Sequence, residues 1–200
     1  MFDIMMHKHI KKIIIIFSLI IGGGIGYYVT HQTPTTVSVA SSDAIEKITI
    51  DEYDQARDEK HIKDQFHADY YWLYPDTSYD VETHVGFMLQ YKAPIEDPLY
   101  VGTLHVKVLH VNGKFAGFTA YYKETLIRGR LLFLDINKDF RKRGLGEKLA
   151  RYAVDELKKM GSQTIVLVTR VTNPAQKIYR RIGFVQDYIQ DGFLNMVLKN

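Results

Sequence analysis

The sequence predicts a mixed α/β fold, with a central mixed sheet of six to seven strands flanked by about four helices. Two observations indicate this fold. A helix-rich stretch is followed by a β meander, and the C-terminal part then runs strand, helix, strand, helix and two strands. Such an order is typical of a mixed sheet and differs from a regular alternation of parallel strands and helices.

The composition fits a folded domain of ordinary size with a short extension. The chain has 200 residues, of which 46% are hydrophobic and 24% charged, enough to build a core. It has no cysteine, which excludes disulfides, thiolate metal sites and a cysteine nucleophile. Three lysines and one aspartate in residues 1–12 supply +2 of the net charge of +3, so no nucleic-acid partner is expected.

Residues 1–30 combine a basic leader with an uncharged apolar run over residues 13–29. The run is close to the minimum length for crossing a hydrocarbon core of about 30 Å. Tyr27 and Tyr28 lie at its far end, where interfacial aromatic residues belong. We interpret residues 1–30 as a transmembrane anchor; the alternatives are a signal segment cleaved near Ala40 and a buried helix.

The basic leader predicts a cytoplasmic N-terminus, so the C-terminal domain of a membrane-anchored protein would lie outside the cytoplasm. Gly22 and Gly26 have the spacing of membrane helices that pair, which leaves a homodimer possible, although the neighbouring glycines favour loosened helix packing. Residues 31–44 are rich in Thr and Ser and are predicted to form a polar linker.

Residues 45–200 are predicted to form the folded domain. A first strand is expected at residues 48–50. Apolar residues recur at helical spacing within residues 53–73, which predicts an amphipathic helix, and residues 80–90 are a second candidate helix. A β region follows over residues 104–111 and 115–122, with Asn112-Gly113 between them. This dipeptide predicts a tight hairpin, since a type I′ turn needs positive φ at both positions.

The C-terminal half alternates between strands and helices. The segment 130–136 is predicted as a strand, and 144–160 as a helix that Gly161 ends. The continuous apolar run 164–169 is typical of a strand covered on both faces. Asn173 and Pro174 suit the start of the next helix, which Gly183 ends. Two strands, 184–189 and 193–198, close the domain around an Asp191-Gly192 turn.

The chemistry is expected where the predicted strand ending at Ile136 meets the helix beginning at Gly144. Between them lies a basic, glycine-bearing turn, Phe140-Arg141-Lys142-Arg143-Gly144-Leu145-Gly146. The first amides of a helix have no partner inside the helix, and the helix dipole makes that end positive. The turn therefore suits a diphosphate. The alternative is a tight turn with solvated basic side chains; no nicotinamide-binding or Walker pattern is present.

Two motifs resemble the GNAT superfamily of N-acetyltransferases. Arg141-x-x-Gly144-x-Gly146 is similar to the R/Q-x-x-G-x-G/A signature of that family, which binds the diphosphate of acetyl-CoA. The segment from Asn173 to Phe184, NPAQKIYRRIGF, is similar to the downstream Asn-x-x-Ala…Tyr-x-x-x-Gly-Phe segment. The resemblance implies a GNAT-like fold, acetyl-CoA as co-substrate, and acetyl transfer to a primary amine of a small molecule or protein.

The resemblance also implies a site. The strand around Leu134 would pair its backbone with the pantetheine arm, and the amides from Arg143 to Glu147 would hold the diphosphate. The cofactor-binding residues expected on this basis are Leu134, Ile136, Arg141, Lys142, Arg143, Gly144, Leu145, Gly146, Glu147, Thr172, Asn173, Ala175 and Tyr179. No metal is expected: the eight histidines lack metal-ligand spacing, and His105 and His110 are interpreted as packed or exposed.

The resemblance assigns Tyr179 as the acid that protonates the leaving thiolate; the alternative is a core tyrosine. Some relatives carry a glutamate base near the position of Leu167, and Thr172 stands where many carry an asparagine. Asp135 is then the nearest candidate base; the alternatives are that Asp135 is a strand residue hydrogen-bonded to a neighbour and that a water chain serves as the base. These departures keep open a second hypothesis, a GNAT-like module that binds an acyl-CoA or a partner protein without turnover. The aromatic cluster at residues 70–75 could wall an acceptor pocket or belong to the core.

Overall fold

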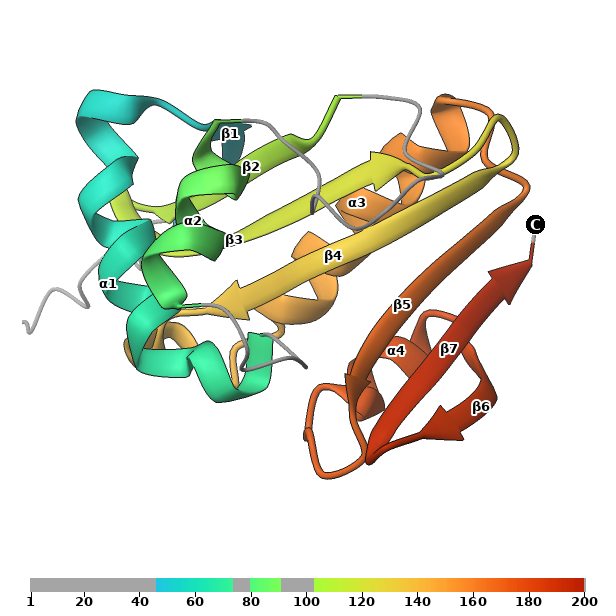
Figure 1. Ribbon diagram of the computed structural model, residues 1–200. Helices are drawn as coiled ribbons and strands as arrows, with labels where there is room; N and C mark the ends of the chain where they lie inside the picture. Colours follow the sequence, from blue (N-terminus) through green and yellow to red (C-terminus); the bar gives the residue numbers. More distant parts are fainter. Residues whose placement is uncertain (1–45, 74–79, 91–102, 200) are drawn as a thin grey trace, which may run out of the picture. The chain divides into compact units, whose positions relative to one another are not determined.

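Seven strands form one sheet in the computed structural model, in the order β1-β2-β3-β4-β5-β7-β6 (Figure 1). The structure describes residues 46–73, 80–90 and 103–199. Neighbouring strands run antiparallel except for β4 and β5, which are parallel. The predicted mixed α/β fold with six to seven strands is therefore confirmed.

The elements follow the predicted order. The strands are β1 (Ile48–Glu52), β2 (His105–Val111), β3 (Lys114–Lys123), β4 (Arg128–Ile136), β5 (Thr164–Arg170), β6 (Val185–Gln190) and β7 (Phe193–Lys199). The helices are α1 (Gln55–Leu73), α2 (Val81–Leu89), α3 (Leu145–Lys159) and α4 (Gln176–Arg181), with a short 3₁₀ turn η1 (Lys138–Phe140).

Two local predictions differ from the structure. The prediction that β5 is covered on both faces was wrong, because Ile165 and Leu167 are buried while the alternate residues are only half-buried. Helix α4 begins at Gln176, later than predicted. The preceding residues form tight turns, in which the Gln176 amide donates to the Asn173 carbonyl at 3.3 Å. Asn173 still acts as a cap, since its side-chain oxygen accepts from the Ala175 amide at 2.9 Å.

The predicted anchor and linker, residues 1–30 and 31–44, lie outside the described residues. Among the helices that the structure describes, none is both long and apolar enough to cross a membrane.

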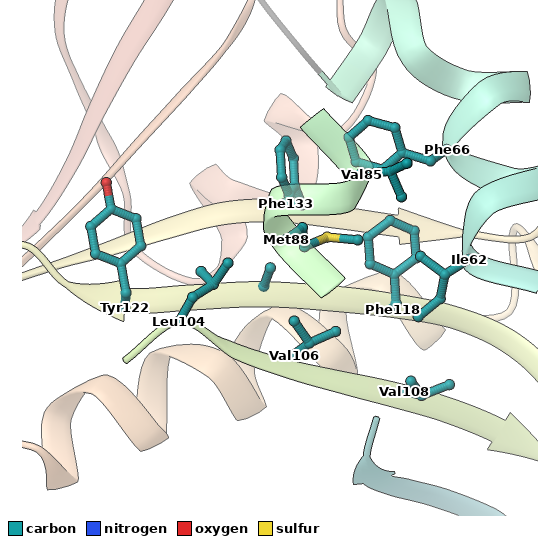
Figure 2. Close-up of a cluster of buried hydrophobic side chains, with 11 residues drawn as sticks. Ile62, Phe66, Val85, Met88, Leu104, Val106, Val108, Phe118, Tyr122 and Phe133 are labelled. Carbon is teal, nitrogen blue, oxygen red and sulfur yellow. The ribbon is translucent and has the colours of Figure 1, made fainter. Parts of the chain in front are cut away.

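Helices cover both faces of the sheet: α1 and α2 lie on one face and α3 on the other (Figure 1). Phe66 of α1 is fully buried and packs edge-on against Phe133 of β4, with ring centroids 5.1 Å apart, and against Phe118 of β3 (Figure 2). Helix α2 adds Val85 and Met88 to the same cluster. This cluster holds α1 against the strand that leads into the predicted site.

A buried polar network fixes the start of α1. Asp58 is fully buried, and its carboxylate accepts from Arg57 at 2.8 Å and contacts His110 Nε2 of β2 at 3.0 Å. The other ring nitrogen of His110 lies 3.3 Å from Asp51. Burial alone would raise the pKa of Asp58, but hydrogen bonds from Arg57, the Asp54 backbone and His110 outweigh burial and hold it below its usual value. His110 is thus packed and paired.

The β2–β3 hairpin has the predicted turn, with φ of 51° at Asn112 and 76° at Gly113. An L-residue at Gly113 would be strained, so we expect Gly113→Ala to lower the free energy of unfolding by about 1–2 kcal/mol. Gly86 in α2 is a matched control, because its φ is ordinary and an added Cβ would meet nothing within 4 Å. Gly86→Ala should stabilise the protein by about 0.5–1 kcal/mol. Urea denaturation would show these opposite signs; equal effects would contradict the turn assignment.

Candidate active site

The sheet opens between β4 and β5. The two strands pair only over Arg128–Arg130 and Thr164–Val166, although β4 continues to Ile136 and β5 to Arg170 (Figure 1). A β-bulge accounts for the divergence. Ala120 of β3 pairs with Phe133 and Tyr121 with Leu131, so Leu132 is an extra residue just beyond the last β4–β5 pair. A bulge bends its strand, and here it directs β4 away from β5.

The end of β4 leaves backbone groups on the open side. The Asn137 amide, just after β4, donates to the Ala116 carbonyl of β3 at 2.9 Å, so it points away from the opening. Because hydrogen-bonded pairs alternate along an antiparallel ladder, the amides of Ile136 and Leu134 point toward β5. The Ile136 amide donates to Asp135 Oδ1 at 2.8 Å. Leu134 is therefore the residue whose backbone is best placed to pair with an extended ligand; its pairing with the pantetheine arm stays a prediction.

The N-terminus of α3 forms a cradle of free amides. Its first intrahelical hydrogen bond runs from the Lys148 amide to the Gly144 carbonyl at 3.1 Å, and no side chain caps Gly144. Lys142 and Gly144 both adopt left-handed φ, 62° and 76°. Glycine accepts this conformation freely, whereas lysine rarely does, and such strain concentrates at functional sites. The helix is 15 residues long, so its dipole adds to the attraction for an anion.

A cavity of about 430 Å³ connects the cradle with the open edge of β4. This volume lies within the range of small-molecule and cofactor sites. Its walls come from α1, β4, the turn after it, the start of α3, the end of β5, and α4. They include Asp69, Trp72, Leu73, Leu132, Phe133, Leu134, Asp135, Ile136, Phe140, Arg141, Lys142, Gly144, Leu145, Gly146, Glu147, Val168, Thr169, Asn173, Pro174, Ala175, Ile178, Tyr179 and Arg181.

The cavity brings together most of the residues predicted from the motifs, but not Arg143 or Thr172. The Arg143 guanidinium pairs with Glu46 and lies over the Phe140 ring, 5.3 Å from its centroid. Thr172 is exposed beside the cavity. Arg141 lines the cavity, but its Nε donates to the Ile136 carbonyl at 2.7 Å and its Nη2 pairs with Asp69 at 2.5 Å. These two donors therefore serve the protein itself.

Tyr179 lies where α4 meets the cavity. Its ring is buried and packs edge-on against Phe184, with centroids 6.2 Å apart. Burial raises the pKa of the phenol, and the nearby charge of Asp135 raises it further. Tyr179 thus keeps its proton at neutral pH, as a general acid must. It is both a core residue and a wall of the cavity, so the two alternatives are not exclusive.

Asp135 lies at the end of β4, on the side that faces α1. Burial raises its pKa to about 7; Gln65 opposes this effect, the charge of Asp69 adds to it, and Arg141 again opposes it. A carboxyl group with a pKa near neutral can accept and release a proton in the working range. Asp135 is accordingly the described carboxyl group of the cavity best suited to act as a base.

Several cavity residues are absent from the motif-based set. Asp69, Trp72 and Leu73 come from the C-terminal end of α1, which supports the pocket-wall interpretation for part of the aromatic cluster. Tyr70 packs into the core against Phe66 instead, and positions 74 and 75 lie outside the described residues. Helical spacing predicts which side chains of α1 share a face. It does not predict which face contacts β4, because that depends on packing between residues far apart in the sequence.

The opening between β4 and β5, the helix N-terminus without a side-chain cap and the buried Tyr179 thus meet at one cavity. The model of the acetyltransferase (GNAT) family matches residues 59–184. The chain therefore belongs to the GNAT family, as the motifs predicted.

Curated relatives match part of the chain. The N-alpha-acetyltransferase 30 of Schizosaccharomyces pombe is 39% identical over 64 residues, covering 32% of this chain and 43% of the relative. The [ribosomal protein bS18]-alanine N-acetyltransferase of Escherichia coli K12 is 32% identical over 83 residues, covering 41% of this chain and 55% of the relative. The chain thus spans about half the length of the curated relatives it matches.

Solved structures share the fold. The PaiA N-acetyltransferase of Thermoplasma acidophilum in complex with coenzyme A aligns with a TM-score of 0.60 at 16% identity, covering 77% of this chain and 99% of that one. Ard1 from Thermoplasma volcanium aligns with a TM-score of 0.58 at 18% identity, covering 76% and 97%. At this identity the likeness concerns the fold alone.

Proposed function

We propose that this protein transfers the acetyl group of acetyl-CoA to a primary amine. The observation that carries the proposal is one continuous cavity joining the amide cradle of α3, the open edge of β4 and the buried Tyr179. The cradle suits a diphosphate, and the β4 edge can pair with an extended amide-bearing arm. The named activities of the relatives agree with this chemistry.

The proposed reaction is direct attack, without a covalent enzyme intermediate. The backbone amide of Leu134 faces the opening and would stabilise the oxyanion that develops when the amine nitrogen bonds to the acetyl carbon. Tyr179 gives its proton to the thiolate as the carbon–sulfur bond breaks. Asp135 takes the proton that the amine loses, directly or through water. Transfer of that proton from Asp135 to Tyr179 through solvent restores both groups.

A polypeptide N-terminus is the acceptor we favour. The residues beside the cavity form an apolar rim, which we define as Tyr71, Trp72 and Val171; their exposed fractions are 56%, 40% and 42%. The rim is held together where Arg170 donates to the Tyr71 carbonyl at 2.5 Å and stacks on the Tyr71 ring. Exposed apolar surface beside a reactive pocket suits a chain that continues beyond the amine. One curated relative described above is named for a protein acceptor, an alanine of ribosomal protein bS18, and the other is named an N-alpha-acetyltransferase.

A GNAT-like module that binds an acyl-CoA or a partner without turnover remains the second candidate. It is favoured by Leu167, which stands near the position where some relatives carry a glutamate base. It would keep the diphosphate cradle while leaving the proton-transfer groups unused.

The proposal extends to the N-terminal region. We propose that residues 13–29 anchor the protein in a membrane, that residues 31–44 tether the domain, and that pairing of the anchors could form a homodimer. The uncharged run and its basic flank support an anchor, with a cleaved signal segment as the alternative. Protease protection of the C-terminal domain in intact cells tests its orientation: protection would contradict a domain outside the cytoplasm.

Release of coenzyme A from acetyl-CoA tests the activity. We expect turnover with short peptides bearing a free N-terminus, and none with the same peptides carrying a blocked N-terminus. Faster turnover with small amines would contradict the polypeptide acceptor. Tight binding of acetyl-CoA without release by any amine would favour the module without turnover.

A further inference from the structure

Arg141 is placed to link two carboxyl groups from different parts of the chain. Its Nη2 lies 2.5 Å from Asp69 of α1 and 3.5 Å from Asp135 of β4. Its Nε donates to the Ile136 carbonyl, which fixes the guanidinium beside the end of β4. The three side chains line the same cavity.

Asp135 has few partners of its own. Its Oδ1 accepts from the Ile136 amide, while its buried Oδ2 makes no hydrogen bond of normal geometry among the described residues, and the side-chain amide of Gln65 faces the carboxyl group and favours its ionised form. Its side chain is 11% exposed, whereas that of Arg141 is 43% exposed, so water screens the Asp135 carboxyl group little and the Arg141 charge partly. A buried carboxyl group with one unsatisfied oxygen depends strongly on the charges placed beside it.

The charged and polar groups that face Asp135 come from three elements. Helix α1 supplies the carboxylate of Asp69 and the amide of Gln65, the turn before α3 supplies the Arg141 guanidinium, and α4 supplies the neutral phenol of Tyr179. Asp69 opposes ionisation of Asp135 and Arg141 favours it. Because Arg141 also pairs with Asp69, a change at either residue alters the effect of the other on the ionisation of Asp135.

We propose that Asp69 and Arg141 are positioning residues for Asp135, which together set its charge and therefore the pH range in which it can accept a proton. The inference rests on the proposed acetyl transfer for its catalytic consequence. The Nε and Nη2 of Arg141 are committed to Ile136 and Asp69, while its role at the diphosphate stays a prediction.

Titration of the Asp135 carboxyl carbon by ¹³C NMR tests the inference in the full chain, with Asp135→Asn to assign the resonance. Asp69→Asn removes the repelling charge and frees Arg141 for Asp135, so the midpoint should fall by at least about one pH unit. Arg141→Gln leaves Asp69 beside Asp135 without its cation, so the midpoint should rise by a similar amount. The acidic limb of kcat/KM with one fixed peptide should move in the same two directions.

Asp64→Asn is the matched control. Asp64 lies on the same helix, is 62% exposed and pairs with Lys60, so its loss should leave the midpoint unchanged. The nearly isosteric Asp69→Asn variant decides the question even if Arg141→Gln folds poorly. An unchanged midpoint in folded Asp69→Asn would overturn the inference and leave the proposed activity standing. Shifted midpoints in a protein that transfers no acetyl group would support the charge relation and overturn the activity.

Discussion

Tyr179→Phe is expected to lower kcat by about 100-fold or more, while the dissociation constant for coenzyme A stays within about threefold of the native value. The substitution removes only the phenolic oxygen, so the buried ring keeps its contact with Phe184. The leaving thiolate then has to take its proton from water. Steady-state kinetics with acetyl-CoA and one peptide, together with calorimetry of coenzyme A binding, would measure the two quantities.

Tyr188→Phe provides the control, because Tyr188 is half-exposed on β6 and does not line the cavity. Its kcat should match that of the native protein. The raised pKa of Tyr179 also predicts that the phenol keeps its proton throughout the neutral range. A kcat for Tyr179→Phe within threefold of the native value would exclude Tyr179 as the acid and leave it as a packing residue.

Phe66→Ala is expected to lower the free energy of unfolding by about 3–5 kcal/mol. Phe66 is fully buried, and its ring packs against Phe118 and Phe133 (Figure 2). It also contacts Tyr70, so truncation leaves a cavity between α1 and the sheet. Domains of this size are stable by only about 5–15 kcal/mol. Urea denaturation followed by far-UV circular dichroism would measure the loss.

Phe115→Ala is the comparison for this prediction. Phe115 is only partly buried at the edge of the same cluster, where it stacks on His61 with centroids 5.4 Å apart. Its loss should cost about 1 kcal/mol. A cost for Phe66→Ala no larger than that for Phe115→Ala would contradict the packing of α1 described above.

Local patterns were sufficient to predict most of the fold. Asn112-Gly113 predicted the hairpin, because few other dipeptides accept two positive φ values. The apolar stripe of α3 and the terminating Gly161 predicted that helix almost to the residue. Burial of β5 was predicted less well, since a run of apolar letters cannot distinguish a strand buried on both faces from one that alternates.

The site could be predicted only where its residues are close in sequence. The turn from Arg141 to Gly146 joins a strand to a helix, so its amide cradle follows from local rules. The pairing of Arg141 with Asp69 spans 72 positions and depends on the docking of α1. The bulge at Leu132 likewise depends on the register with β3, so its position could not be read from β4 alone.

The central claim is that the amides at the start of α3 hold the diphosphate of acetyl-CoA. A crystal structure of the protein with acetyl-CoA tests this most directly. We predict phosphate oxygens about 2.7–3.2 Å from the amide nitrogens of Leu145, Gly146 and Glu147, with the pantetheine arm along the open edge of β4. A coenzyme bound at another surface, or no bound coenzyme at saturating concentration with those amides left free, would contradict the account.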